Sequence, residues 1–319
     1  MNLKDKTIPE EIKKNLEQLG KSGASLTLFM HIPKTGGSTI SSSLRQGDFH
    51  KVLWLPEWED VRNCTCGDKA CRRALNRFEK LELMANQENV GKSIYVHSGG
   101  HLAYESVKQY TDLLGITSRW GSVMTIVRPA KNRIVSMFRD YWTQVQLAKD
   151  IALAEKVHRL APDPEDPPHI QLGDALSGDW KPSQHILNTR RNYLEDSLHY
   201  CDSEGNINGP AWFRAFGEFG GGVPFFMDDV FQGRFRTFRR LVRSKRLRVV
   251  STKNVDALTA ELTGKVQPRR RTSLPITPAI DTAISDSRKI IAELAKRDEK
   301  YDKFLAKWLK DPDFLQSKI

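Results

Sequence analysis

The chain has 319 residues, 39% of them hydrophobic, and a formal net charge of +11. This length and apolar content can fill the core of one large α/β domain, which excludes a disordered chain. Since no run approaches the roughly 18 apolar residues that span a bilayer and no apolar signal core is present, we expect no membrane span and a cytoplasmic location, or the Golgi lumen if the sequence is a truncated part of a longer chain.

The predicted elements alternate between strands and helices. After a charged helical extension at residues 1–22, short apolar runs predict buried strands and amphipathic patterns predict helices. This alternation favours right-handed crossovers and a mostly parallel sheet covered on both faces. We therefore expect a single three-layer α/β/α domain over residues 1–319, with a core over about 25–290 and C-terminal helices over about 278–310. The predicted strands are 25–32, 93–98, 122–127 and 246–252, and the predicted helices are 39–46, 72–87, 104–114, 131–160 and 278–309.

The first strand runs directly into residues 31–39, HIPKTGGST, and then into a helix. Backbone amides and the positive end of a helix dipole attract an anion at such a junction. Gly36 and Gly37 permit positive φ and a close backbone approach, Lys34 adds a cation, and the next two residues carry hydroxyl donors. The segment therefore predicts a P-loop-like, phosphate-binding turn.

The order of residues in this turn differs from that of a Walker A motif. In G-x-x-x-x-G-K-[ST] the lysine follows the second glycine and precedes the hydroxyl that binds magnesium. Lys34 instead precedes both glycines. This order weighs against an ATPase or kinase that depends on Mg²⁺.

Three of the four cysteines, Cys64, Cys66 and Cys71, lie close together, and Cys201 is far away in the sequence. Thiolates at this spacing can bind zinc if Cys201 or a histidine such as His50 supplies a fourth ligand, although paired C-x-x-C knuckles are absent. A structural zinc site, a disulfide and unpaired thiols all stay open for this cluster.

Two histidines lie in residues 93–106. His97 ends a predicted strand and His101 follows two glycines. A neutral imidazole, whose usual pKa is about 6.5, can accept a proton from an attacking hydroxyl at physiological pH. Each histidine is a candidate general base, and the alternative for each is a hydrogen-bonded structural role.

A second anion site is predicted where the strand over 122–127 ends at Arg128. Ser136 follows eight residues later, two turns into the next predicted helix. A guanidinium group and a hydroxyl can donate to one phosphate from different sides.

Later segments are less regular. The proline-rich residues 161–169 and the glycine-rich residues 217–224 predict exposed loops. Basic residues concentrate in 233–248, where Phe and Leu alternate with Arg as in an amphipathic helix, and in 268–273. The basic helix either exposes a solvated face or attracts an acidic acceptor.

The HIPKTGG loop and the eight-residue arginine-to-serine spacing resemble sulfotransferases that use 3′-phosphoadenosine 5′-phosphosulfate. The similarity is to carbohydrate sulfotransferases of the heparan sulfate 2-O-sulfotransferase branch and to bacterial sulfotransferase family 2 proteins. It implies that the loop grips the 5′-phosphosulfate and that Arg128 and Ser136 bind the 3′-phosphate, which distinguishes this donor from ATP. Pro129 follows the arginine directly, whereas the family's proline lies two residues after it. The implied loop contacts are Lys34, Thr35, Gly36, Gly37, Ser38 and Thr39.

Three further segments carry weaker resemblance. GHLAY resembles the glycine-histidine-x-x-tyrosine feature of the 2-O branch, which implies His101 as the catalytic base and leaves His97 as a second candidate. SQHILNTRRNYL resembles a helix near the acceptor cleft, which implies Arg190 and Arg191 as acceptor contacts, with a solvated helix face as the alternative. PRRRTSLP resembles a late basic loop that closes over the donor, and its implied contacts are Arg270, Arg271 and Thr272.

The resemblance implies in-line transfer of a sulfuryl group to an acceptor hydroxyl, with adenosine 3′,5′-bisphosphate as the other product and no metal required. The expected acceptor is a glycan or a small molecule, and the positive charge favours an acidic one. We expect no nucleic-acid partner, and the oligomeric state and the acceptor stay open. The alternative functions are a P-loop nucleotide kinase or NTPase and a non-catalytic basic glycan-binding module.

Overall fold

The computed structural model forms two compact units, each assembled from separate stretches of chain. The first comprises Met1–Arg128, Val223–Gln267 and Lys303–Asp311, and the second comprises the remaining stretches. The single domain expected from the sequence stays a prediction. The structure describes residues 25–37, 39–40, 52–54, 93–97, 103–105, 121–149, 193, 195–219, 224–263, 277–311 and 313–315.

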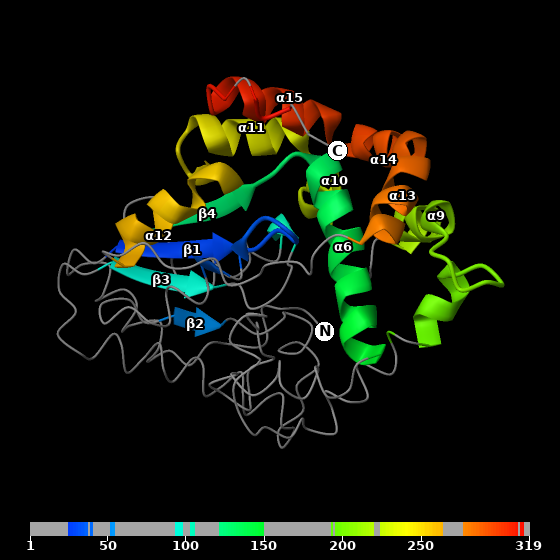
Figure 1. Cartoon of the computed structure of the whole chain (residues 1–319). Helices are drawn as coiled ribbons and strands as arrows, with labels where there is room; N and C mark the ends of the chain where they lie inside the picture. Colours follow the sequence, from blue (N-terminus) through cyan, green and yellow to red (C-terminus); the bar gives the residue numbers. More distant parts are fainter. Residues whose placement is uncertain are drawn as a thin grey trace, which may run out of the picture. The chain divides into compact units, whose positions relative to one another are not determined.

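Figure 1 labels the helices and strands by their order in the chain. The described elements, with η marking a 3-10 helix, are β1 (Ser25–Met30), β2 (Val52–Trp54), β3 (Ser93–His97), β4 (Gly121–Val127), α6 (Ala130–Lys149), η3 (Leu198–Tyr200), α9 (Gly209–Phe219), α10 (Met227–Val230), α11 (Phe235–Arg243), β5 (Leu247–Ser251), η5 (Thr252–Asn254), α12 (Val255–Thr263), α13 (Pro278–Asp286), α14 (Arg288–Ala295), η6 (Lys296–Asp298) and α15 (Glu299–Trp308).

The first unit is built on a parallel sheet whose described strands follow the order β2-β3-β1-β4-β5. Leu28 of the central strand β1 lies level with Val96 of β3 and Val123 of β4. Every described pair of neighbouring strands is parallel. Because parallel strands end at the same edge, the loops that follow β1, β3 and β4 leave the sheet at one edge.

Both faces of the sheet are covered. Leu28, Phe29 and Met30 are consecutive and fully buried, although successive side chains of a strand point to opposite faces. On one face, Phe29 packs with Met124 of β4, and this cluster is closed by Ile40 and by residues of α12. The α/β class with a parallel central sheet, predicted from the alternating pattern, is therefore confirmed.

Aromatic side chains join the helices of the first unit. Phe238 is buried on the inner face of α11, and its ring lies 4.8 Å from that of Phe231. The ring of Phe304, in the last part of α15, lies 5.7 Å from that of Phe238. The C-terminal end of the chain thus contributes to the packing around α11.

The second unit is organised around α6. Phe138 is fully buried in α6 and stacks on Phe213 of α9, with ring centroids 4.7 Å apart. Tyr141 donates its hydroxyl hydrogen bond to Asp196 over 2.6 Å, and burial together with this carboxylate raises the Tyr141 pKa well above its ordinary value. These contacts hold the stretch from Asp196 to Phe213 on α6.

The structure corrects the predicted start of the glycine-rich loop. Residues 217–219, predicted to begin a glycine-rich loop, instead form the last turn of α9. A Cβ atom at Gly217 would lie 2.5 Å from Leu294 Cδ2, so the glycine permits α9 to approach α14 closely. The glycine therefore serves helix packing at this position and does not break the helix.

No helix among the described residues is long and apolar enough to cross a membrane.

Candidate functional site

The predicted phosphate loop follows the carboxyl end of β1, in the middle of the described sheet. Lys34 and Gly36 both have left-handed backbone, with φ of 60° and 88°. Glycine takes this conformation without strain, whereas for lysine it costs roughly 1–2 kcal/mol. The loop therefore holds Lys34 in a backbone conformation that is unfavourable for a lysine residue.

Position 37 requires glycine because there is no room for a side chain. A Cβ atom there would lie 2.1 Å from Cδ2 of the His31 ring, far inside a van der Waals contact. His31 itself stacks on Phe29 of β1, with ring centroids 6.1 Å apart. At Gly36 a Cβ would meet Val255 at an ordinary 3.4 Å, so that glycine is required by its φ and not by crowding.

Buried hydrogen bonds fix the path of the loop. The hydroxyl of Thr35 donates to the carbonyl of Ile32 over 2.7 Å, and Thr125 of β4 donates to the carbonyl of Met30 over 2.8 Å. The Thr39 amide donates to the carbonyl of Gly36 over 3.1 Å and so begins the helical turn. The Thr35 hydroxyl is thus used within the loop itself.

This arrangement suits an anion. The helical turn begins at Gly37, and the first amides of a helix have no acceptor within that helix. A helix start carries a partial positive charge, and the half-buried Lys34 adds a full one. The loop can therefore present a cation and backbone donors to a phosphate group.

The residues of the second predicted anion site are each half-buried. Arg128 directly follows β4 and belongs to the first unit, whereas Ser136 lies in α6 in the second unit. Their convergence on one phosphate stays a prediction.

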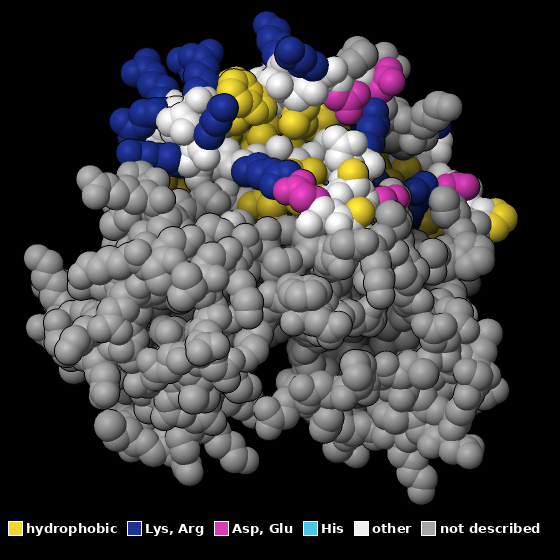
Figure 2. Space-filling view, turned by 90° about the vertical axis from the view of Figure 1, so that its left-hand side faces the viewer, with side chains coloured by type: hydrophobic (Ala, Val, Ile, Leu, Met, Phe, Trp, Pro, Cys, Tyr) yellow, Lys and Arg dark blue, Asp and Glu magenta, His cyan; other side chains and the backbone are white. Residues whose placement is uncertain are grey.

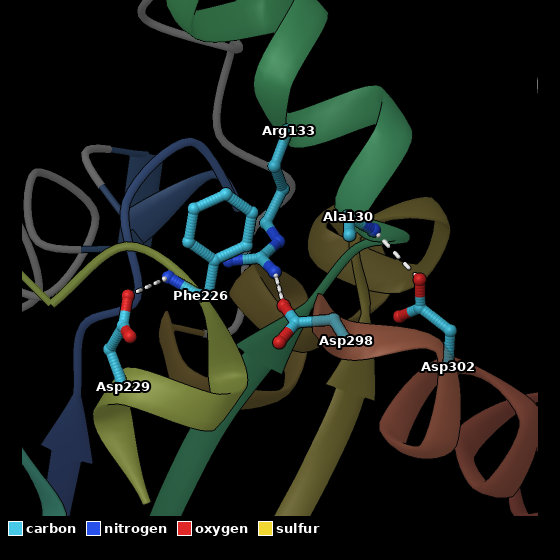
Figure 3. A network of polar contacts seen from close by, with 6 residues as sticks. All are labelled: Ala130, Arg133, Phe226, Asp229, Asp298 and Asp302. Carbon is cyan, nitrogen blue, oxygen red and sulfur yellow. Dashed lines mark hydrogen bonds and ion pairs between the residues drawn. The ribbon is translucent and has the colours of Figure 1, made fainter. Parts of the chain in front are cut away.

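The start of α6 is held by two carboxylates that the sequence analysis did not single out (Figure 3). Asp302 accepts a hydrogen bond from the Ala130 amide over 2.9 Å, and Asp298 forms a buried ion pair with Arg133. Within the described part of the chain, Asp302 Oδ1 has no hydrogen-bond partner. Burial raises the pKa of Asp302 to about 7, although the Ala130 amide and the Arg133 charge lower it.

A separate contact in Figure 3 lies in the first unit, where the Phe226 amide donates to Asp229 over 3.3 Å at the start of α10.

The segment that follows the predicted base is anchored to the turn before α11. The Tyr104 ring lies 5.2 Å from that of Phe231, and Glu105 pairs with Arg234 over 3.1 Å. His97 ends β3 level with Phe29, so its backbone lies at the sheet edge from which the phosphate loop leaves. His101 itself lies outside the described residues.

No family model matches the chain, and no curated protein matches it. Among solved structures, mouse sulfotransferase SULT7A1 complexed with PAP is similar over 96% of this chain and 90% of that chain, with 14% sequence identity and a TM-score of 0.29. At this TM-score the similarity does not establish a family for this chain. The candidate site therefore rests on the loop geometry.

The remaining predicted site residues lie outside the described part of the chain. Cys201 carries a free thiol, and among the described residues no group of His, Cys, Asp or Glu side chains is arranged to hold a metal ion. Zinc and disulfide bonding at the cysteine cluster stay predictions. The predicted site residues that lie outside the described part are Ser38, Cys64, Cys66, Cys71, His101, Arg190, Arg191, Arg270, Arg271 and Thr272.

Proposed function

We propose that the protein is a sulfotransferase that moves the sulfuryl group of 3′-phosphoadenosine 5′-phosphosulfate to an acceptor hydroxyl. The observation that carries the proposal is the loop after β1, in which Lys34 precedes two glycines and is itself left-handed. This order differs from a magnesium-binding Walker A motif. The loop needs Gly36 for its φ, and Gly37 because the His31 ring leaves no room for a Cβ atom. Glycines also permit backbone to approach a phosphate closely.

In the proposed reaction the acceptor oxygen forms a bond to sulfur while the bond from sulfur to the bridging oxygen breaks. Lys34 and the loop amides stabilise the charge that develops on the bridging and leaving oxygens. His101 accepts the hydroxyl proton, with His97 as the second candidate. Adenosine 3′,5′-bisphosphate leaves, and no metal takes part in this proposal.

Binding of the donor is proposed to use both ends of the nucleotide. Arg128 and Ser136 would hold the 3′-phosphate, because a guanidinium group and a hydroxyl can donate to the same anion. Arg270, Arg271 and Thr272 are the further proposed donor contacts. A carbohydrate hydroxyl is the proposed acceptor, with Arg190 and Arg191 beside it.

Calorimetric titration tests the donor. We expect adenosine 3′,5′-bisphosphate to bind at least tenfold more tightly than ADP, and Mg²⁺ to leave its affinity unchanged. Equal affinity for the two nucleotides, or binding of ADP only with Mg²⁺, would favour a kinase or NTPase and overturn the proposal.

Transfer of radiolabelled sulfate to a panel of glycan acceptors tests the chemistry. Lys34→Ala should lower the rate by about 100-fold, because removing one donor to a developing oxyanion costs that order of rate. Lys310→Ala is the matched control, since Lys310 is also left-handed, with φ of 50°, and is exposed. Full activity of Lys34→Ala would rule out the assigned role of the loop. Tight nucleotide binding without any transfer would instead indicate a binding module.

A further inference from the structure

One face of α11 is strongly basic. Arg236, Arg239, Arg240 and Arg243 are all exposed, and with 3.6 residues per turn they fall within an arc of about 100°. The opposite side of the helix is apolar, and Phe238 there is fully buried. The helix is thus fixed by its aromatic side and leaves four guanidinium groups in solvent.

The end of α15 extends this face. The ring of Phe304 lies 6.2 Å from that of Phe235, which places this part of α15 beside α11. Trp308 stacks on Phe304 with ring centroids 6.0 Å apart, and 40% of its surface is exposed. Residues 234–246 and 303–310 together contain ten Lys or Arg residues and no Asp or Glu. An exposed indole therefore lies among segments rich in positive side chains, with Glu105 paired to Arg234 and Asp311 directly after residue 310 as neighbouring acidic groups.

The C-terminal end of α11 lies at the edge of the sheet opposite to the phosphate loop. Residues 244–246 connect α11 directly to β5, and α11 packs on β5, so the helix runs opposite to the strands. Its last arginine lies where β5 begins, whereas the loop lies where β1 ends. Figure 2 faces the left-hand side of Figure 1, where Lys and Arg side chains gather around hydrophobic ones in the upper part of the view, with some Asp and Glu side chains beside them.

We infer that this surface, formed by Arg236, Arg239, Arg240, Arg243 and Trp308, docks the protein on a membrane rich in anionic phospholipid. Basic side chains near such a surface attract it electrostatically, and an indole ring is suited to the headgroup region because it is amphipathic. The inference does not depend on the proposed transfer reaction.

Two alternative occupants fit less well. An acceptor chain must reach the donor loop, whereas the last arginine of α11 lies where β5 begins, at the opposite edge of the sheet. A single-stranded nucleic acid is held by a row of stacking aromatic rings, and Phe238 of α11 is buried while Phe235 is partly buried against its neighbours.

Co-sedimentation of the full chain with vesicles tests the inference. We expect binding to vesicles of phosphatidylcholine and phosphatidylserine at a 7:3 ratio, and no binding to phosphatidylcholine alone. The double substitution Arg239→Gln/Arg243→Gln should weaken binding by about 25-fold, roughly fivefold for each cation. Arg288→Gln/Lys289→Gln, an exposed pair on α14 with the same charge change, is the matched control and should change binding less than twofold.

In the wild-type background, Trp308→Ala should also weaken vesicle binding, without changing the affinity for adenosine 3′,5′-bisphosphate. That nucleotide affinity also shows that each variant is folded, and circular dichroism replaces it if the wild type does not bind the nucleotide. Equal losses in the two double variants, or binding to neutral vesicles as tight as to anionic ones, would overturn the inference. Absence of vesicle binding would overturn it as well, and competition by heparin or by a short RNA would then identify a soluble polyanion as the occupant.

Discussion

A second glycine with left-handed backbone, Gly205, allows the proposed role of Gly36 in donor binding to be separated from the effect of backbone strain. Gly36 has φ of 88° and Gly205 has φ of 82°, and a Cβ atom would meet no neighbour closer than 3.4 Å at either position. Replacement by alanine should destabilise the protein by about 1–2 kcal/mol at both positions, because both require the same unfavourable φ. Only Gly36→Ala should weaken adenosine 3′,5′-bisphosphate binding, by tenfold or more.

Urea unfolding and calorimetry measure these two effects. Gly205→Ala is the matched control for backbone strain. Similar losses of stability with unchanged nucleotide affinity in both variants would remove Gly36 from the donor site.

Asp302 should make stability depend on pH. Its pKa is raised by burial to about 7 in the folded protein from 3.8, so the folded state binds the proton more tightly between these values. Stability contributed by the protonated group is therefore lost as pH rises, by about 3 kcal/mol between pH 5 and pH 8. Asp302→Asn should remove most of this slope, whereas Asp286→Asn, an exposed change on α13, should preserve it.

The free energy of unfolding in urea, measured at pH 5, 6, 7 and 8, gives the slope directly. A wild-type slope that persists in Asp302→Asn would show that another group titrates.

At the scale of elements, the sequence predicted four of the five described strands because buried parallel strands are continuous apolar runs. The three residues of β2 are too few to give such a pattern. α9 was not predicted, and its last turn was assigned to a loop because a glycine signals a loop unless its packing partner is known. That partner, Leu294, lies far away in the sequence.

In the candidate site, too, features set by neighbouring residues were predictable and contacts between residues far apart in the sequence were not. The phosphate loop was predictable because its lysine, its glycines and the preceding strand are adjacent in sequence. The contacts that hold the start of α6 were not, since Asp298 and Asp302 are 165 and 172 residues away from their partners. Nothing in the local sequence of η6 and α15 separates these carboxylates from ordinary surface acids.

The anchored segment after His101 gives a prediction at this scale. Tyr104→Leu removes the ring contact with Phe231, and Arg234→Gln removes the ion pair with Glu105. We expect the double variant to lower the rate of sulfate transfer by about tenfold or more, because small displacements of a proton acceptor are costly.

The affinity of this variant for adenosine 3′,5′-bisphosphate should stay within twofold, which separates misplacement of the base from loss of the fold. Tyr200→Leu removes a comparable ring contact, with Tyr141, and should leave the transfer rate unchanged. An unchanged rate in the double variant would mean that the anchor does not position the base.

At the scale of the whole molecule, the C-terminal helices are part of both units. Residues 277–302 belong to the second unit and residues 303–311 to the first. A chain that ends at residue 276 would leave Arg133 buried without Asp298, at a cost of roughly 3–5 kcal/mol, and would remove Phe304 from α11. Since a domain is stable by only about 5–15 kcal/mol, we expect this chain to lose its cooperative unfolding transition and its resistance to protease.

A chain that ends at residue 315 is the matched control and should behave as the wild type, because it keeps every described contact of these helices. Circular dichroism during urea unfolding, together with limited proteolysis, distinguishes the two chains. A cooperative transition in the shorter chain would show that the helices after residue 276 are an appendage. Its absence would mean that the last helices complete the core, because the first unit receives Phe304 from them and the second receives Asp298.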